Sequence, residues 1–165
     1  MGRIKRELFA HLINVTPSED TGTYERLGED LEEYNVEMNP ESDEKKNILG
    51  NTKYEVSGYK PQSSVEPLYA DSGTGLHQLL QKIIDGRLVG DDLKTDVLEV
   101  QLWNPTTEGS TDTFKAYKDE VVIEVSSYGG DTTGYQIPFN LHYTNKRVEG
   151  TYDAVQKTFT PTVNV

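Results

Sequence analysis

Residues 135–143 have the sequence Tyr135-Gln136-Ile137-Pro138-Phe139-Asn140-Leu141-His142-Tyr143. Large apolar or aromatic side chains occupy every second position of this stretch, and mostly polar residues lie between them. Because successive side chains of a strand point to opposite faces of a sheet, this alternation predicts a long strand with one buried face. Pro138 has no backbone N–H to donate to a neighbouring strand, so we expect the strand to lie at an edge or to carry a bulge.

The same period of two recurs along the chain and predicts a largely β protein. Further strands are predicted at residues 7–15, 31–38, 44–49, 53–59, 97–103, 120–127 and 150–160. The turn residues Asn39-Pro40-Glu41-Ser42 separate two of these strands. We therefore expect a long β-hairpin over about residues 31–50, with its tip at this turn.

One segment changes period and predicts an α-helix over about residues 74–85. Its apolar residues recur at the i, i+3, i+4, i+7 and i+8 positions of one helical stripe, namely Leu76, Leu79, Leu80, Ile83 and Ile84. Asp71, Ser72 and Thr74 are all suitable N-terminal caps, and Asp85-Gly86 favours a left-handed stop. The sequence has no repeat of fixed period and no long linker. It therefore predicts a single domain over residues 1–165, a β-sandwich or barrel-like fold with one flanking helix.

The chain is strongly acidic, with a formal net charge of −12 over 165 residues. Most of this charge lies in residues 19–44, which contain eleven acidic residues and one basic residue, Arg26. Such a balance disfavours DNA or an anionic membrane as a direct binding partner. The chain has no cysteine, which excludes disulfides and thiolate metal sites. No apolar stretch approaches the roughly 18 residues needed to span a bilayer.

No constellation of residues predicts chemistry. The three histidines show no metal-ligand spacing, and no nucleophile motif or phosphate-binding glycine loop is present. Asp91, Asp92 and Asp96 cluster between the predicted helix and a strand, but their spacing is not that of a calcium loop and Lys94 lies among them. We expect a structural turn there. The sequence thus predicts a protein that is not an enzyme and has no catalytic residues, metal or cofactor.

An ordered set of segments resembles the tail tube (major tail) proteins of long-tailed phages and prophages of Gram-positive bacteria. The resemblance covers about residues 5–160 and leaves the segment up to Tyr24 without a clear match. Its segments are the acidic hairpin ending in Met38-Asn-Pro-Glu41, Ser57-Gly-Tyr-Lys-Pro61, the single helix, Gly90-Asp-Asp-Leu-Lys-Thr-Asp-Val-Leu-Glu-Val-Gln-Leu-Trp103, the turn Gly129-Gly-Asp131 and the closing residues 150–160.

The resemblance implies a structural protein of the virion tail that is assembled in the host cytoplasm. Six subunits would form a ring whose sheets join into an inner barrel, and stacked rings would make a hollow tube for DNA. Tape-measure and other tail proteins would be its partners, DNA would pass without specific binding, and no membrane anchor is expected. Acidic side chains near the lumen would repel DNA phosphates within a Debye length of about 8 Å.

Particular residues are expected to carry these roles. Glu33 and Glu37, on the polar face of the predicted hairpin, are expected to face the lumen, followed by Glu55 and Glu124. The predicted hairpin tip is expected to contact another subunit or ring. Its residues are Asn39, Pro40, Glu41, Ser42 and Asp43.

Two groups of alternatives remain open. The first is another ring-forming tail component, such as a distal tail or terminator protein, or a secretion-tube protein. The second belongs to a different class, a β-sandwich module that binds carbohydrate or calcium, which the tyrosine content and the Asp91–Asp92–Asp96 cluster suggest.

Overall fold

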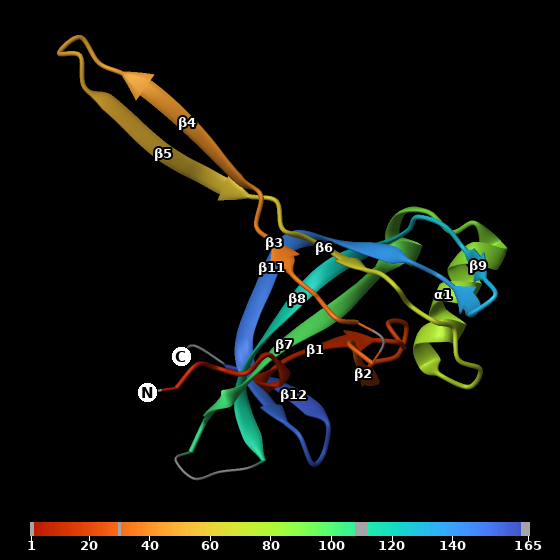
Figure 1. The fold of residues 1–165 in the computed structure, drawn as a ribbon. Coiled ribbons are helices and arrows are strands. Elements are labelled where there is room, and N and C mark those ends of the chain that lie inside the picture. Colours follow the sequence, from red (N-terminus) through yellow and green to blue (C-terminus); the bar gives the residue numbers. More distant parts are fainter. Residues whose placement is uncertain (1, 30, 108–111, 163–165) are drawn as a thin grey trace.

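The computed structural model describes residues 2–29, 31–107 and 112–162, which fold mainly as β-strands with one α-helix, as the sequence predicts. Figure 1 shows a sheet that forms the body of the molecule, the helix at one side, and a hairpin arm that projects far from the sheet. The body strands are β1 (Phe9–Asn14), β2 (Tyr24–Arg26), β3 (Val36–Glu37), β6 (Gln62–Val65), β7 (Lys94–Pro105), β8 (Thr113–Val125), β11 (Phe139–Asp153) and β12 (Thr158–Pro161). The arm contains β4 (Pro40–Lys46) and β5 (Thr52–Tyr59), and the remaining elements are β9 (Gly129–Asp131), β10 (Gly134–Gln136), α1 (Gly75–Gly86) and the 3₁₀ turns η1 (Arg6–Leu8) and η2 (Gly90–Leu93).

The eight body strands are hydrogen-bonded into one antiparallel sheet. Its order is β2-β1-β7-β8-β11-β6-β3, and β12 pairs with the far end of β11. β11 is the longest strand and is flanked by β8 and β6, so it is central rather than at an edge. The strand predicted over 135–143 is interrupted at Pro138, which lies between β10 and β11. The bulge occurs further along, between Tyr143 and Arg147, and the strand predicted over 150–160 is split into the end of β11 and β12.

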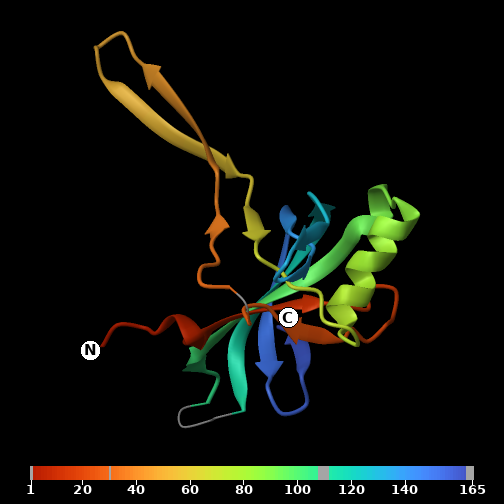
Figure 2. The same ribbon diagram turned by 45° about the vertical axis from the view of Figure 1, so that its right-hand side comes forward.

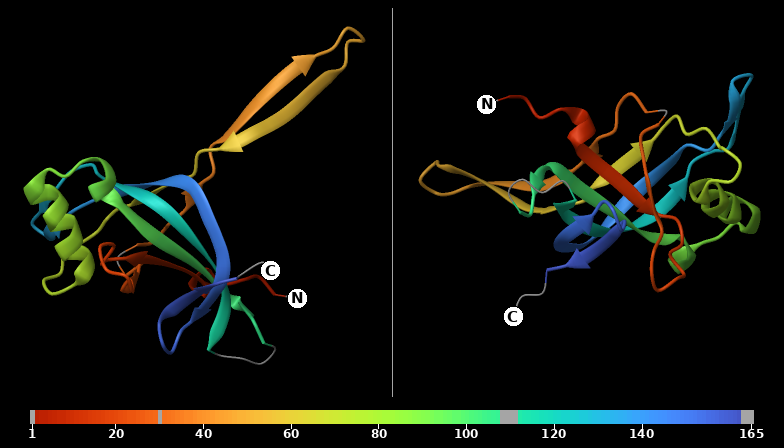
Figure 3. Two further views of the ribbon diagram at one scale, coloured as in Figure 1. Left: turned by 180° about the vertical axis from the view of Figure 1, so that it is seen from behind. Right: turned by 90° about the horizontal axis from the view of Figure 1, so that it is seen from below.

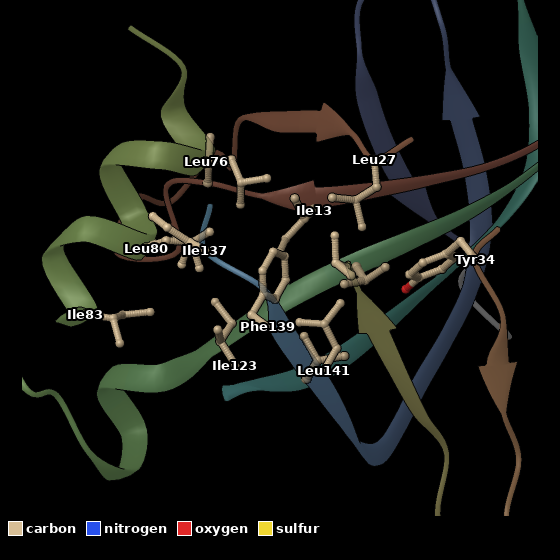
Figure 4. Packing of buried hydrophobic residues seen from close by; sticks show 14 of the residues in the cluster. Ile13, Leu27, Tyr34, Leu76, Leu80, Ile83, Ile123, Ile137, Phe139 and Leu141 are labelled. Carbon is tan, nitrogen blue, oxygen red and sulfur yellow. The ribbon is translucent and has the colours of Figure 1, made fainter. Parts of the chain in front are cut away.

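The two faces of the sheet carry separate apolar clusters. The first packs strand residues such as Ile13, Ile123, Phe139 and Leu141 against the helix, as Figure 4 shows. The second lies on the opposite face, because its β1 members alternate with those of the first cluster. It contains Ala10, Leu12, Leu98, Val100, Ala116 and Tyr152. Alternating residues along β11 therefore bury one face, as predicted for Phe139, Leu141 and Tyr143.

The helix confirms the sequence prediction to within about one residue at each end. The Thr74 hydroxyl oxygen accepts a hydrogen bond from the His77 backbone N–H at 3.3 Å, which caps the first turn. The carboxylate of Glu25, from β2, accepts the backbone N–H of Gly75 at 2.7 Å. Anionic groups stabilise helix N-termini, so this contact ties the helix to the sheet edge. The left-handed stop falls on Arg87, one residue beyond the predicted glycine.

The hairpin prediction is wrong in its position. The observed arm spans Pro40–Tyr59, and its turn lies at residues 47–51, not at 39–42. Of the predicted first strand over 31–38, only Val36–Glu37 is a strand, and it pairs with β6 in the body. The predicted pattern failed because Tyr34 turns into the core and hydrogen-bonds Ser63 at 2.8 Å. Tyr34 is buried because it packs against the body sheet and not because it lies in a hairpin.

Candidate functional site

The projecting arm is the most unusual surface of the molecule. All seven residues of β4 and seven of the eight residues of β5 are exposed, and Figures 2 and 3 show the arm clear of the body in further views. Two apolar side chains of β5, Tyr54 and Val56, are 66% and 51% exposed. A two-stranded hairpin is marginally stable in water on its own. The arm therefore buries little of its surface against the rest of the described chain.

The tip of the arm is apolar and is surrounded by positive charge. The Asn47 side-chain oxygen accepts the backbone N–H groups of Leu49 and Asn51, both at 3.0 Å, and so shapes the turn. Ile48 is fully exposed and Leu49 is 80% exposed. Three lysines lie just behind them, Lys45, Lys46 and Lys53, and residues 45–53 contain no acid. We call residues 45–53 the arm tip.

The predicted tip residues lie at the other end of the arm. Asn39 precedes β4 with a positive φ of 43°, and its side chain donates to the Lys60 carbonyl at 3.1 Å. Pro40, Glu41, Ser42 and Asp43 form the base half of β4. Glu41 pairs with Lys60 at 2.8 Å on the exposed surface. These residues therefore fix the arm to the body, and the expectation that they form its tip is wrong.

The face of the sheet opposite the first core cluster carries the second apolar cluster at one end and an uncovered polar part at the other, which we call the polar face. On this polar face, side chains of β6, β11 and β8 are hydrogen-bonded to one another. Ser64 donates to Asn140 at 2.7 Å, and Asn140 donates to Glu124 at 3.1 Å. His142 contacts the other Glu124 oxygen at 3.1 Å. The hydrogen bond from Asn140 is the main cause that lowers the pKa of Glu124. The carboxylate is therefore held ionised on this face.

Two of the four predicted lumen acids share that face. Glu37 in β3 is paired opposite Gln62, whose neighbours in β6 alternate between core and surface, so Glu37 points to the same side as Glu124. Glu33 lies in the loop before β3, where its carboxylate accepts from Asn35 at 2.7 Å. Glu55 lies on the arm, away from this face, and pairs with Lys53 at 3.0 Å. The four acids are therefore divided between the sheet face, its adjoining loop and the arm.

A charge cluster with two buried acids bridges three neighbouring strands. Arg147 in β11 donates to Glu99 in β7 at 2.9 Å and to Asp119 in β8 at 3.0 Å. The same guanidinium lies over the Tyr117 ring, 4.1 Å from its centroid. Burial raises the pKa of Asp119 to about 6, despite the nearby arginine. Sequence reasoning missed this cluster, because the three strands meet only in the folded sheet.

A groove lies at the base of the arm, next to the charge cluster. It consists of two adjoining hollows of about 670 and 560 Å³, whose walls share Arg6, Phe9, His11 and Tyr34. The larger hollow adds the apolar side chains of Val36, Met38, Tyr59 and Pro61. The smaller one adds the acids Glu7, Glu29, Glu32 and Glu33. We call the two together the base groove.

His11 forms part of the wall of this groove as a neutral side chain. It is 3% exposed and packs edge-on against Phe9 and Tyr34. Burial, and then the charges of Arg6 and Arg26, lower the pKa of His11 to about 3. Its Nε2 atom has no hydrogen-bond partner among the residues that the structure describes. The histidine is therefore an aromatic packing residue in this state.

The structure offers no candidate metal centre within the described residues, where no three His, Asp or Glu side chains are grouped to hold an ion. Two acids of the Asp91–Asp92–Asp96 cluster are paired with lysines. Asp91 pairs with Lys94 at 2.9 Å, and Asp96 lies 3.7 Å from Lys118. In the same part of the chain, no helix has both the length and the apolar character required to cross a membrane.

No protein-family model matches the chain, and no curated protein sequence matches it. The surfaces that bear on function are therefore the arm, the polar sheet face and the base groove.

Proposed function

We propose that this chain is the subunit of a phage-type tail tube, in which hexameric rings stack into a hollow conduit for DNA. The observation that carries the proposal is the arm. Its strands bury almost nothing in the single chain, and Tyr54 and Val56 of β5 are exposed to solvent. Ile48 and Leu49, in the turn between the strands, are exposed as well. Such a structure becomes stable when a second chain covers it, so the arm is best explained as an assembly element.

The body of the molecule supports the same proposal. Its outer strands β2 and β3 are three and two residues long, and short edges of this kind suppress uncontrolled pairing while leaving room for a specific neighbour. A contact between different surfaces of identical chains is heterologous and generates rings or open filaments. Closed rings that stack through their arms would combine a ring with an open filament.

The charge distribution supports a conduit for a polyanion. The polar sheet face presents Glu37 and Glu124, and a ring of six copies would carry six times the net charge of −12. A lumen lined by this face repels DNA phosphates over about 8 Å, the Debye length at physiological salt. DNA would then slide past the wall without adhering to it. Further copies of the chain and other tail proteins, among them a tape-measure protein, would be the partners in the virion.

Electron microscopy of the concentrated protein tests the proposal. We expect the full chain to form hollow, open-ended tubes, and a variant in which residues 41–58 are replaced by a short glycine linker to keep a folded body but form none. Closed single rings would instead favour a distal tail or terminator component. A chain that stays monomeric in sedimentation at all concentrations and salts would contradict the proposal.

A further inference from the structure

We propose that the arm tip of one copy docks in the base groove of the next copy, with Ile48 and Leu49 inserted among its apolar side chains. This inference rests on the proposed function and names the surface that the arm binds. The occupant is a second copy of this chain, and the following observations identify it.

The first observation is one of length. Met38 and Tyr59 flank the arm at its base and line the groove, whereas Ile48 lies at the far end of the hairpin. At about 3.4 Å per residue, the eight residues of β5 separate tip and groove by about 27 Å. The paired strands run away from the body and do not fold back onto it, as Figures 1 and 3 show. The tip of one chain therefore cannot occupy its own groove.

The second observation is one of chemical complementarity. The arm tip carries Lys45, Lys46 and Lys53 around two exposed aliphatic side chains. The base groove has the reciprocal arrangement, because apolar walls in the larger hollow adjoin acids in the smaller one, and the six acids that line the two hollows outnumber the arginines Arg6, Arg26 and Arg147. Its acids Glu29 and Glu32 are exposed and engage no cation in a salt bridge within the described residues. Tip and groove thus match in both polarity and charge.

The third argument is geometric and concerns the kind of assembly that this contact would generate. The tip and groove are different surfaces at opposite ends of one arm. A copy shifted along the arm by about its own length, about 27 Å, presents its groove to the tip of the copy behind it. Repeating the step leaves a free tip at one end and a free groove at the other. The contact is therefore open-ended, as stacking of rings into a tube requires.

Charge reversal with complementation tests the pairing in the full chain. The tip variant is K45E/K46E, and the groove variant is E29K/E32K. Each alone opposes like charges at the contact, so we expect each to lose tube formation, with a rise of at least 10-fold in the concentration needed for assembly. In an equimolar mixture, each tip meets a groove of opposite charge. We expect the mixture to regain assembly.

The controls separate this pairing from the proposed function. All four positions are exposed, so both variants should melt within a few degrees of the wild type. If the wild type forms tubes while both variants assemble normally, or while the mixture fails to recover, tip-to-groove docking is wrong and the tube proposal stands. If the wild type never assembles, both fail. Binding of the wild type to phosphatidylserine vesicles that the tip variant loses, with assembly of that variant unaffected, would also overturn the docking and indicate a membrane-directed tip.

Disulfide trapping gives a second, independent test. The chain has no cysteine, so introduced pairs are its only thiols. Under mild oxidation, the double variant L49C/M38C should form a ladder of linked chains, because each copy offers one tip thiol and one groove thiol. Each single variant can form at most dimers. A double variant that gives no products beyond dimers under assembly conditions would contradict the pairing.

Discussion

His11 offers a quantitative test of the chemistry beneath the base groove. In the folded chain its pKa is lowered to about 3 from the ordinary value of 6.5, mainly by burial and then by Arg6 and Arg26. A histidine with a lowered pKa stabilises the fold fully above pH 6.5, and this contribution is lost as the pH falls toward 3. At pH 5 His11 is protonated in the unfolded chain and neutral in the folded chain. The free energy of unfolding should therefore fall by about 2 kcal/mol between pH 8 and pH 5 from this group alone.

The substitution His11→Leu replaces the titrating group with a side chain of similar volume. It should therefore remove this part of the fall in the free energy of unfolding. Glu99 faces His11 across the β1–β7 pair and Tyr34 packs on its ring, and both stay in place. Urea unfolding at pH 5 and pH 8, at concentrations where the chain sediments as a monomer, gives the pH difference for each protein. We expect the difference to be about 2 kcal/mol smaller in the variant.

A matched control is available on the surface. His142 is half-exposed beside Glu124, so His142→Gln should alter the same pH difference by less than about 1 kcal/mol. Equal pH differences for wild type and His11→Leu would refute the reasoning, because they would show that residue 11 is not held neutral by burial.

Three further predictions concern the cluster, the sheet and the polar face. Burial raises the pKa of Asp119 to about 6, so its contribution to stability is present below about pH 4 and is lost as pH rises through 6. Asp119→Asn should remove this loss, so urea unfolding should show a stability change from pH 4 to pH 7 that is about 2 kcal/mol more favourable than in the wild type. An unchanged pH profile would contradict this. Gly150→Ala should cost about 1–3 kcal/mol in the same assay, because a Cβ there would lie 2.6 Å from an aromatic ring of β12; a neutral effect would show that β12 is not packed as described. Tubes of the double variant Glu37→Lys/Glu124→Lys should retain double-stranded DNA in low-salt co-sedimentation and release it at high salt, whereas Asp92→Lys tubes should not; equal retention would place the polar face away from the lumen.

The sequence predicted those elements that bury a regular face. The helix was found because its apolar residues repeat with the period of a helix, and β7, β8 and the start of β11 because theirs alternate. The arm was misplaced for the same physical reason. Its strands are exposed on both sides, so no buried face imposes a pattern on Pro40–Lys46. The turn residues Asn47 and Gly50, the latter with a φ of 82°, were the available signal for its true tip.

The candidate site was less accessible to sequence reasoning. Of the alternating residues Tyr34, Val36 and Met38, only Tyr34 is buried, so the alternation could not distinguish a hairpin strand from a short strand of the body. The pairing of Arg147 with Asp119 and Glu99 joins residues that are 28 and 48 positions apart in the chain. Position along one chain also cannot show that Glu55 leaves the sheet with the arm while Glu37 stays on it. Only the register of the folded strands separates them.

A cryo-electron-microscopy reconstruction of the concentrated full chain would test the central claim most directly. We predict stacked six-fold rings around an open bore, with Glu37 and Glu124 facing the bore and every arm engaged with the adjacent ring. A bore with a basic or apolar lining, or arms that point into solvent with no neighbour, would contradict the account.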